Sequence, residues 1–283
     1  MKKSKYLILA FLTLIACNGS HHKVSEVTED TPAAPIVNYI RSIDYTDTVA
    51  LHDENIMQER MANLTKLILK SDSLSLQTGL SLFFNNIKHD EKALNSVTSL
   101  ANLYLNNPAS PVRDTNRYID FLNALLSVDS IPSSVREIEE ERLHIAALNR
   151  PGIIATDFNF VNRDGTHSSL HQVTGNKTLL IFFDPECSHC SDILKYIAKH
   201  PRINSAISDS TLTVLAIYAE GKKDVWENTK HAMPPAWTVG YDMSDILDNE
   251  LYDLPAMPTL YLLDSDKRVI LKDPDANHLV QLF

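Results

Sequence analysis

Hydrophobic residues recur at helical spacing through the first half of the chain. Between residues 36 and 149, apolar positions repeat about every 3.6 residues, while glycines and strand patterns are almost absent. Amphipathic runs begin at Asp53, Ser73, Glu91, Asp114 and Ser133. Three of these runs are expected to extend over Ser73–Ile87, Glu91–Leu105 and Ser133–Leu148. The pattern predicts an all-helical domain at 36–149 and gives no indication of its role.

The hydrophobic pattern changes to period two after Pro151-Gly152. Asp164-Gly165 separates two alternating runs, which is typical of a β-hairpin. Further strands are predicted at Leu179–Phe183, Leu212–Tyr218, Trp237–Tyr241, Thr259–Leu263 and Val269–Leu271. Helices are predicted between them at Cys187–Lys199, Val225–Lys230 and Met243–Leu251. Strands that alternate with helices and finish in a hairpin predict an α/β domain at 150–283, a mixed sheet with helices on its faces.

The N-terminus has the pattern of a targeting segment. Lys2, Lys3 and Lys5 precede a short apolar run that ends in Leu14-Ile15-Ala16-Cys17. Residues 1–16 are therefore interpreted as a signal peptide, and a cysteine directly after Ala16 resembles the lipidated first residue of a bacterial lipoprotein. A plain secretory signal that happens to contain a cysteine is the alternative. The polar stretch 17–35 is expected to be a flexible tether.

Charge and cysteine content agree with a location in the cell envelope. The net charge is −10, and it becomes −13 once the three lysines of the signal peptide are removed. So acidic a protein is a poor candidate for binding nucleic acid or anionic lipid through its charge. Attachment to a membrane is therefore expected through lipid on Cys17. Of the three cysteines, a lipidated Cys17 leaves one pair in an oxidising compartment. We expect a lipid-anchored protein of the outer membrane that faces the periplasm.

That pair, Cys187 and Cys190, forms a C-x-x-C motif between a buried strand and a helix. The positive end of a helix dipole stabilises a thiolate, which favours a redox site. Zinc sites use the same spacing but need further ligands, and the only other cysteine is Cys17. The sequence therefore favours a redox dithiol over a metal site.

Three motifs in order resemble the thioredoxin superfamily, in its TlpA/ResA-like and redoxin (AhpC/TSA-type) branch. They are D-F-N-F-V-N-R-D-G-T from Asp157, F-F-D-P-E-C-S-H-C from Phe182 and A-M-P-T-L-Y-L-L-D from Ala256. The resemblance covers roughly residues 149–283 and implies a thioredoxin-like fold with an N-terminal β-hairpin. The signal and helical region resemble envelope lipoproteins of gut-type Gram-negative bacteria, in which an uncharacterised helical domain precedes a thioredoxin domain.

The resemblance implies a role for each site residue. Cys187 is the nucleophile that forms a mixed disulfide, and Cys190, one helical turn deeper, resolves it. His189 stabilises the thiolate when protonated, whereas the charge of Glu186 opposes it. Pro258 matches the family's cis-proline, and the backbone of Met257 is expected to bind an extended substrate.

The sequence also departs from the family. Ile181 replaces the buried acid of thioredoxin, so Asp192 or Glu186 is left as a proton acceptor for Cys190. Asp184 replaces the threonine of peroxiredoxins, which disfavours peroxidase activity.

The sequence thus predicts an envelope protein-disulfide oxidoreductase of undetermined direction. It needs no metal or organic cofactor beyond the redox-active disulfide Cys187–Cys190. Its expected partners are thiols and disulfides of envelope proteins and a membrane electron donor or acceptor. The alternative is a binding or assembly lipoprotein that uses the thioredoxin fold as a scaffold.

Overall fold

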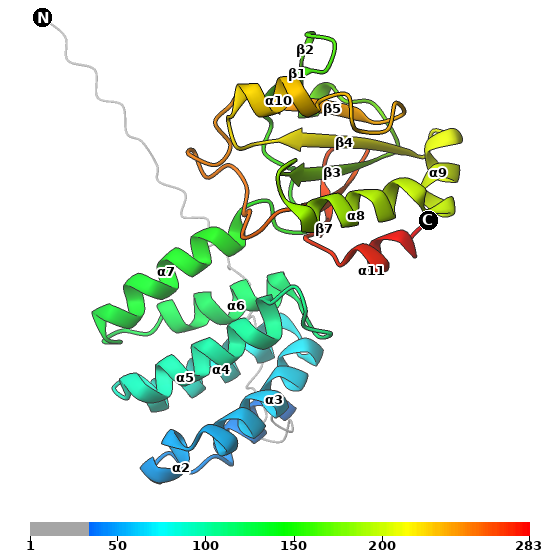
Figure 1. Ribbon diagram of the computed structural model, residues 1–283. Helices are drawn as coiled ribbons and strands as arrows, with labels where there is room; N and C mark the ends of the chain where they lie inside the picture. The colour runs from blue at the N-terminus through cyan, green and yellow to red at the C-terminus, as the bar shows by residue number, and fades with distance from the viewer. Residues whose placement is uncertain (1–33) are drawn as a thin grey trace, which may run out of the picture. The chain divides into compact units, whose positions relative to one another are not determined.

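The computed structural model describes residues 34–283 (Figure 1). The predicted signal peptide, Cys17 and nearly all of the predicted tether lie outside these described residues. Within the described part of the chain, none of the helices has the length and apolar character needed to cross a membrane.

The N-terminal half of the described chain is helical, as the periodicity predicts (Figure 1, blue to green). Its helices are α1 (Pro35–Arg41), α2 (Thr48–His52), α3 (Glu54–Lys70), α4 (Ser73–Ile87), α5 (Glu91–Ala101), α6 (Thr115–Leu126) and α7 (Ser133–Ala147). A π-helical turn, η1 (Asn102–Asn106), follows α5, so the single helix expected over Glu91–Leu105 changes its hydrogen bonding at Asn102.

Aspartates begin most of these helices. The carboxylates of the capping residues each accept a hydrogen bond from the backbone N–H three residues later; they are Asp47, Asp53, Asp72, Asp90 and Asp114. A side chain at this position satisfies a backbone donor that the helix leaves unpaired, and its charge is favourable at the positive end of the dipole. Behind the caps, Phe84 and Phe121 pack edge to face at 5.0 Å in the core.

The C-terminal half contains a seven-stranded sheet in the order β2-β1-β5-β4-β3-β6-β7. The strands are β1 (Asn159–Asn162), β2 (His167–Ser169), β3 (Lys177–Phe183), β4 (Leu212–Tyr218), β5 (Thr238–Asp242), β6 (Thr259–Asp264) and β7 (Val269–Lys272). The central strands β3, β4 and β5 run parallel, whereas β1 and β6 pair antiparallel to them at the two sides. The predicted mixed sheet, hairpin included, is confirmed.

The two faces of β3 are buried differently. Leu179, Ile181 and Phe183 pack in a core with helices α8 (Ser188–Lys199), α9 (Pro201–Ser208), α10 (Lys223–Thr229) and α11 (Ala276–Val280). Leu180 and Phe182 point to the other face, where the segments before β1 and before β6 supply the partners. Burial on both faces explains why this strand has no polar alternation in its sequence.

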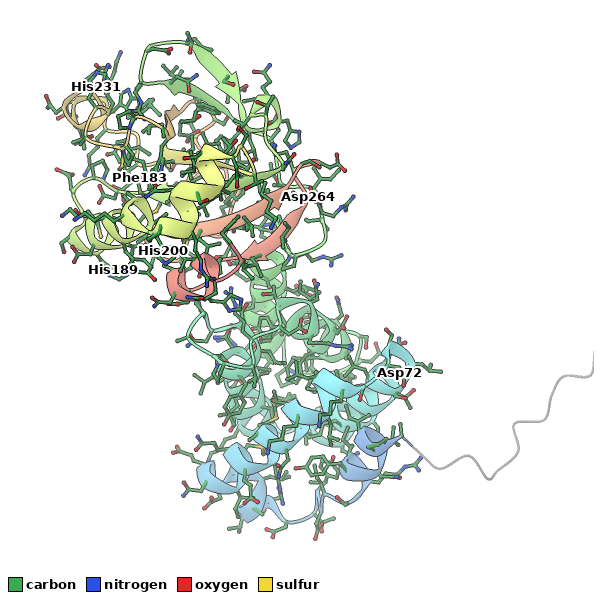
Figure 2. The ribbon with its side chains drawn as sticks, turned by 90° about the vertical axis from the view of Figure 1, so that its right-hand side faces the viewer. Asp72, Phe183, His189, His200, His231 and Asp264 are labelled. Atoms are coloured by element: carbon green, nitrogen blue, oxygen red, sulfur yellow. The ribbon has the colours of Figure 1, made fainter. Side chains whose placement is uncertain are left out.

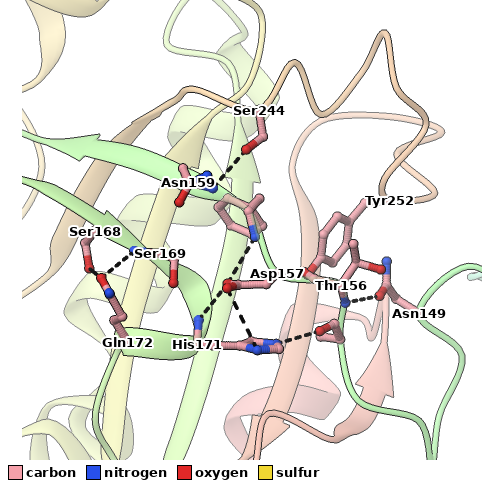
Figure 3. Close-up of polar contacts among 12 residues, drawn as sticks. Asn149, Thr156, Asp157, Asn159, Ser168, Ser169, His171, Gln172, Ser244 and Tyr252 are labelled. Carbon is pink, nitrogen blue, oxygen red and sulfur yellow. Dashed lines mark hydrogen bonds and ion pairs between the residues drawn. The ribbon is translucent and has the colours of Figure 1, made fainter.

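The segment that joins β1 and β2 to the sheet is held by side-chain hydrogen bonds (Figure 3). The Asp157 carboxylate accepts hydrogen bonds from the backbone N–H of Phe158 and of His171, at 3.1 and 2.9 Å. Tyr252 donates its hydroxyl to the carbonyl of Thr156 at 2.6 Å. Asp157, the first residue of the D-F-N-F motif, therefore holds the segment that leads into β1.

The prediction of a helix over Met243–Leu251 is wrong, because this stretch forms turns. The buried carboxylate of Asp242 accepts hydrogen bonds from the N–H groups of Ser244 and Ile246, at 2.8 and 2.7 Å. Asp245 and Glu250 have positive φ angles of 51° and 47°, outside the helical region. Local carboxylate bonds thus replace helical ones here.

Two basic side chains connect the helices to the sheet. The guanidinium of Arg113 donates to the carbonyls of Lys272 and Asp273 at 3.0 and 2.7 Å. The ammonium of Lys272 lies 2.9 Å from the Asp253 carboxylate and 3.0 Å from the carbonyl of Leu148, at the end of α7. A cation at the negative end of a helix is favourable, and here it also pairs with a carboxylate.

Candidate active site

The C-x-x-C motif lies at the N-terminus of α8, directly after the buried strand β3. Cys187 is the N-cap of this helix, and its sulfur accepts a hydrogen bond from the backbone N–H of Cys190 at 3.4 Å. Because the first N–H groups of a helix have no partner within it, they stabilise negative charge on such a sulfur. The motif thus lies at the start of a helix after a buried strand, where its sequence context predicts it.

The two thiols, both free, differ in their surroundings. Cys187 is partly exposed, whereas Cys190 is fully buried against Ile181, Phe183 and Leu194. Burial raises the pKa of the Cys190 thiol from 9.0 to about 12. An accessible sulfur at the helix start and a protonated, buried sulfur behind it are what a nucleophile and a resolving cysteine require.

Met257 and Pro258 lie beside the first cysteine. The Cys187 thiol contacts the carbonyl of Met257, with sulfur and oxygen 3.9 Å apart. The Met257–Pro258 peptide bond is cis, as the resemblance implies. Strand β6 begins only at Thr259, and in residues 34–283 the Met257 N–H has no hydrogen-bond acceptor. Its backbone therefore keeps a donor free next to the sulfur.

Charged side chains surround the exposed edge of the motif. Glu186 pairs with Lys222, whose ammonium lies 2.9 Å from the Glu186 carboxylate and 3.9 Å from that of Glu220. Glu186 raises the pKa of Lys222 through this hydrogen bond. His189 projects from the first turn of α8 and is exposed (Figure 2). The sequence interpretation missed Lys222, which partly compensates the charge of Glu186.

Lys222 is brought to the motif by the sheet. Strands β3 and β4 pair in parallel with Phe183 opposite Tyr218, so the loops after both strands lie at the same edge. The spacing of 36 residues between Glu186 and Lys222 has no local signature. A sequence analysis that paired the two strands and compared the residues after them could have found it.

The acid that thioredoxin places behind its motif is absent at the aligned position, since Ile181 is fully buried among apolar side chains. Asp192 is exposed on α8, and Glu186 is bound to Lys222. Asp184 is only half-buried, and its backbone N–H lowers the pKa of Cys190 against the larger effect of burial. In residues 34–283, no group of three or more His, Cys, Asp or Glu side chains is placed to hold a metal ion.

Comparisons with known proteins bear on the helical domain and on the fold. Residues 36–149 match a family model described as a domain of unknown function, DUF5106. No curated protein matches the chain.

Three similar solved structures come from Bacteroides. A thioredoxin-like protein from Bacteroides caccae shares 28% identity over 87% of this chain and 90% of its own, with a TM-score of 0.76. The C-terminal domain of an uncharacterised Bacteroides fragilis protein shares 36% identity over 48% of this chain and 98% of its own, with a TM-score of 0.46. A conserved Bacteroides fragilis protein of unknown function shares 38% identity over 47% and 98%, with a TM-score of 0.45.

The first of these structures is described as a thioredoxin-like protein. The present chain has features expected of that fold: the order of its strands, the C-x-x-C at the start of α8 and the cis-proline beside it. The chain therefore has a thioredoxin-like fold in its C-terminal part, similar to that of the Bacteroides caccae protein, and an uncharacterised helical domain precedes it.

Proposed function

We propose that this protein is a thiol-disulfide oxidoreductase that exchanges disulfides with protein substrates through Cys187 and Cys190. The observation that carries the proposal is the difference between the two sulfurs. One is accessible at a helix N-terminus beside the free N–H of Met257, and the other is buried with a raised pKa one turn behind it. A structural disulfide needs no such difference. The relatives' thioredoxin-like fold supports the same chemistry.

The reaction in the reducing direction has two steps. The Cys187 thiolate attacks one sulfur of a substrate disulfide, forms a mixed disulfide and releases the other substrate sulfur as a thiolate. Cys190 then gives its proton to solvent, and its thiolate attacks the Cys187 sulfur, which releases the second substrate thiolate and leaves the Cys187–Cys190 disulfide. Two electrons pass from the dithiol to the substrate, and the reverse sequence oxidises a substrate dithiol. The sulfurs themselves carry these electrons, so we propose no metal or organic cofactor.

Charges at the motif set the balance between the two directions. A protonated His189 stabilises the Cys187 thiolate and makes the site more oxidising. Glu186 acts in the opposite sense, but its pairing with Lys222 weakens that effect.

We further propose that the protein acts in the cell envelope, anchored by lipid on Cys17 to the outer membrane and facing the periplasm. Its partners there are the thiols and disulfides of envelope proteins and a membrane electron donor or acceptor. The lipoprotein pattern at Leu14–Cys17 supports this address. Cys17→Ala should abolish lipidation and release the protein from the membrane fraction; equal membrane binding and processing would contradict the anchor.

Trapping tests the enzymatic proposal. Because Cys190 resolves the mixed disulfide, Cys190→Ala should accumulate mixed disulfides with envelope proteins, seen as bands on a non-reducing gel that disappear on reduction. Cys187→Ser/Cys190→Ser is the matched control and should show none. An empty gel for Cys190→Ala, with partners still bound by the double variant, would point to a scaffold instead.

A further inference from the structure

A cavity of about 880 Å³ opens beside the redox motif. His189, Ile193 and Pro258 form its side nearest the cysteines. The opposite side belongs to the helical region, where Pro108, Ala109 and Arg113 of the loop between η1 and α6, residues 107–114, line the space. The cavity therefore lies between the reactive edge of the thioredoxin-like part and the helical domain, and its volume is within the range of ligand sites.

The 107–114 loop is held firmly at this place. The hydroxyl of Ser110 donates to the carbonyl of Tyr104 at 2.6 Å, and the N–H of Asp114 donates to that of Leu105 at 3.0 Å. Arg113 attaches the loop to the end of β7 through two carbonyls at 3.0 and 2.7 Å. A wall fixed on both sides can select what enters beside the dithiol.

Most charged groups on the walls are already bound within the protein. Asp114 accepts a hydrogen bond from the N–H of Arg117, and Asp275 accepts from those of Asn277 and His278. Arg113 donates to backbone carbonyls, and Lys272 is paired with Asp253. The two cations of the wall, Arg113 and Lys272, therefore have donors engaged within the protein and are poorly placed to bind an anionic ligand.

Asp273 and a few polar side chains also line the cavity, namely Ser110, Thr115, Asn116, His189 and His278, but the larger part of the remaining lining is apolar. This apolar part consists of aliphatic side chains and prolines, chiefly Ile193, Leu260, Ile270, Leu271, Pro111 and Pro274. Ile270 remains 39% exposed on β7 and gains from being covered. Next to this surface, the free N–H of Met257 offers main-chain pairing to an extended strand. Apolar walls with a main-chain donor at one end fit an extended apolar segment of polypeptide.

We propose that this cavity is a specificity pocket, in which the 107–114 loop and β7 bind an extended apolar segment next to the substrate's cysteine. The proposal rests on the proposed thiol-disulfide exchange and assigns the helical domain a part in it. The pocket binds the polypeptide on one side of the cysteine, while the sulfur itself reaches Cys187.

The test uses two short peptides of equal length, each with one cysteine joined by a disulfide to thionitrobenzoate. Apolar residues flank the cysteine in one peptide, and glycine and serine flank it in the other. The Cys187 thiolate of the reduced protein attacks the peptide sulfur and expels thionitrobenzoate, whose colour gives the rate. Cys190 then displaces the peptide thiol. The apolar peptide should react about tenfold faster, since burying one aliphatic side chain is worth at least that factor.

Two variants, one on each wall, should remove this preference. Ala109→Trp fills the cavity from the exposed loop, and Ile270→Glu places a charge in it; both should slow the apolar peptide to the rate of the glycine-serine peptide. Neither should change the rate with the glycine-serine peptide or with the free aromatic disulfide. Val49→Trp is the matched control, because Val49 is 79% exposed on α2 and does not line the cavity.

Each failure has a distinct meaning. No preference in the unchanged protein, or a preference that survives Ala109→Trp and Ile270→Glu, would overturn the pocket while leaving the exchange function intact. No reaction with any of the three disulfides would overturn both proposals. A dimer that Ala109→Trp dissociates in analytical ultracentrifugation would make the cavity an interface between copies and overturn the peptide pocket.

Discussion

At the scale of residues, the two cysteines of the motif have different properties because one caps a helix and the other is buried behind it. The Cys187 sulfur is partly exposed and accepts a helix N–H, while Cys190 is surrounded by apolar side chains. The same thiol chemistry therefore gives one reactive and one protected sulfur.

Alkylation should distinguish the two thiols. In the reduced protein at neutral pH, iodoacetamide should modify Cys187 and leave Cys190 intact, because Cys190 is buried and burial raises its pKa to about 12. Peptide mapping by mass spectrometry measures this. Because the pKa of Cys190 is higher in the folded than in the unfolded protein, the protonated thiol contributes to the free energy of unfolding. This contribution is fully present below about pH 9 and is lost as the pH rises towards 12. Equal modification of both cysteines at pH 7 would contradict this difference.

The ion pair beside the motif should affect the reactivity of Cys187. Lys222→Ala leaves the charge of Glu186 uncompensated next to the sulfur, which disfavours the thiolate, so alkylation of Cys187 at pH 7 should slow by roughly twofold. High salt should reduce the effect, since both side chains are exposed. Lys223→Ala, at the neighbouring exposed lysine, is the control. An unchanged or faster rate in Lys222→Ala would contradict a role for the pair.

At the scale of elements, hydrophobic periodicity predicts most of the structure. Two elements have the bounds that the pattern predicts, namely α4 at Ser73–Ile87 and β4 at Leu212–Tyr218. The helix packs through one continuous apolar face, and the strand is buried along almost its whole length. The pattern fails over Met243–Leu251, where local hydrogen bonds to the Asp242 carboxylate decide the conformation. It also omits α9, which begins at Pro201; a proline is suited to the first position of a helix as well as to the end of one.

The turn after β5 should depend on its aspartate. Asp242→Ala leaves two backbone N–H groups without their acceptor in a buried place, so the free energy of unfolding should fall by about 2 kcal/mol. Urea denaturation measures this change. The exposed Asp248→Ala, in the same turn, should change stability by less than about 0.5 kcal/mol. Equal effects of the two substitutions would show that the carboxylate bonds do not hold the turn.

At the scale of the whole molecule, buried polar contacts connect the helical domain to the sheet. Lys272 binds Asp253 and the end of α7, and Arg113 binds the end of β7. Sequence reasoning predicted the dithiol from its spacing and flanking strand. It could not predict these contacts or the cavity, because partners such as Arg113 and Lys272 are brought together only by the fold.

The connection should make the described chain unfold as one unit. Lys272→Met leaves Asp253 unpaired and removes the cation at the end of α7, which should cost about 3 kcal/mol. Differential scanning calorimetry should then resolve two transitions where the unchanged protein shows one. Lys92→Met, at an exposed lysine of α5, should leave one transition. A single, unshifted transition in Lys272→Met would contradict this role.

The most direct test of the central claim is the equilibrium titration of Cys187 and Cys190 against glutathione, in the protein without residues 1–17. Trapped thiols are counted by mass at each ratio of reduced to oxidised glutathione. We predict a two-electron transition with a potential between about −270 mV, that of a reductant such as thioredoxin, and about −120 mV, that of a disulfide donor. Its position gives the direction in which the protein works. If the cysteines undergo no exchange at any ratio, they are not a redox couple, and the proposed function is wrong.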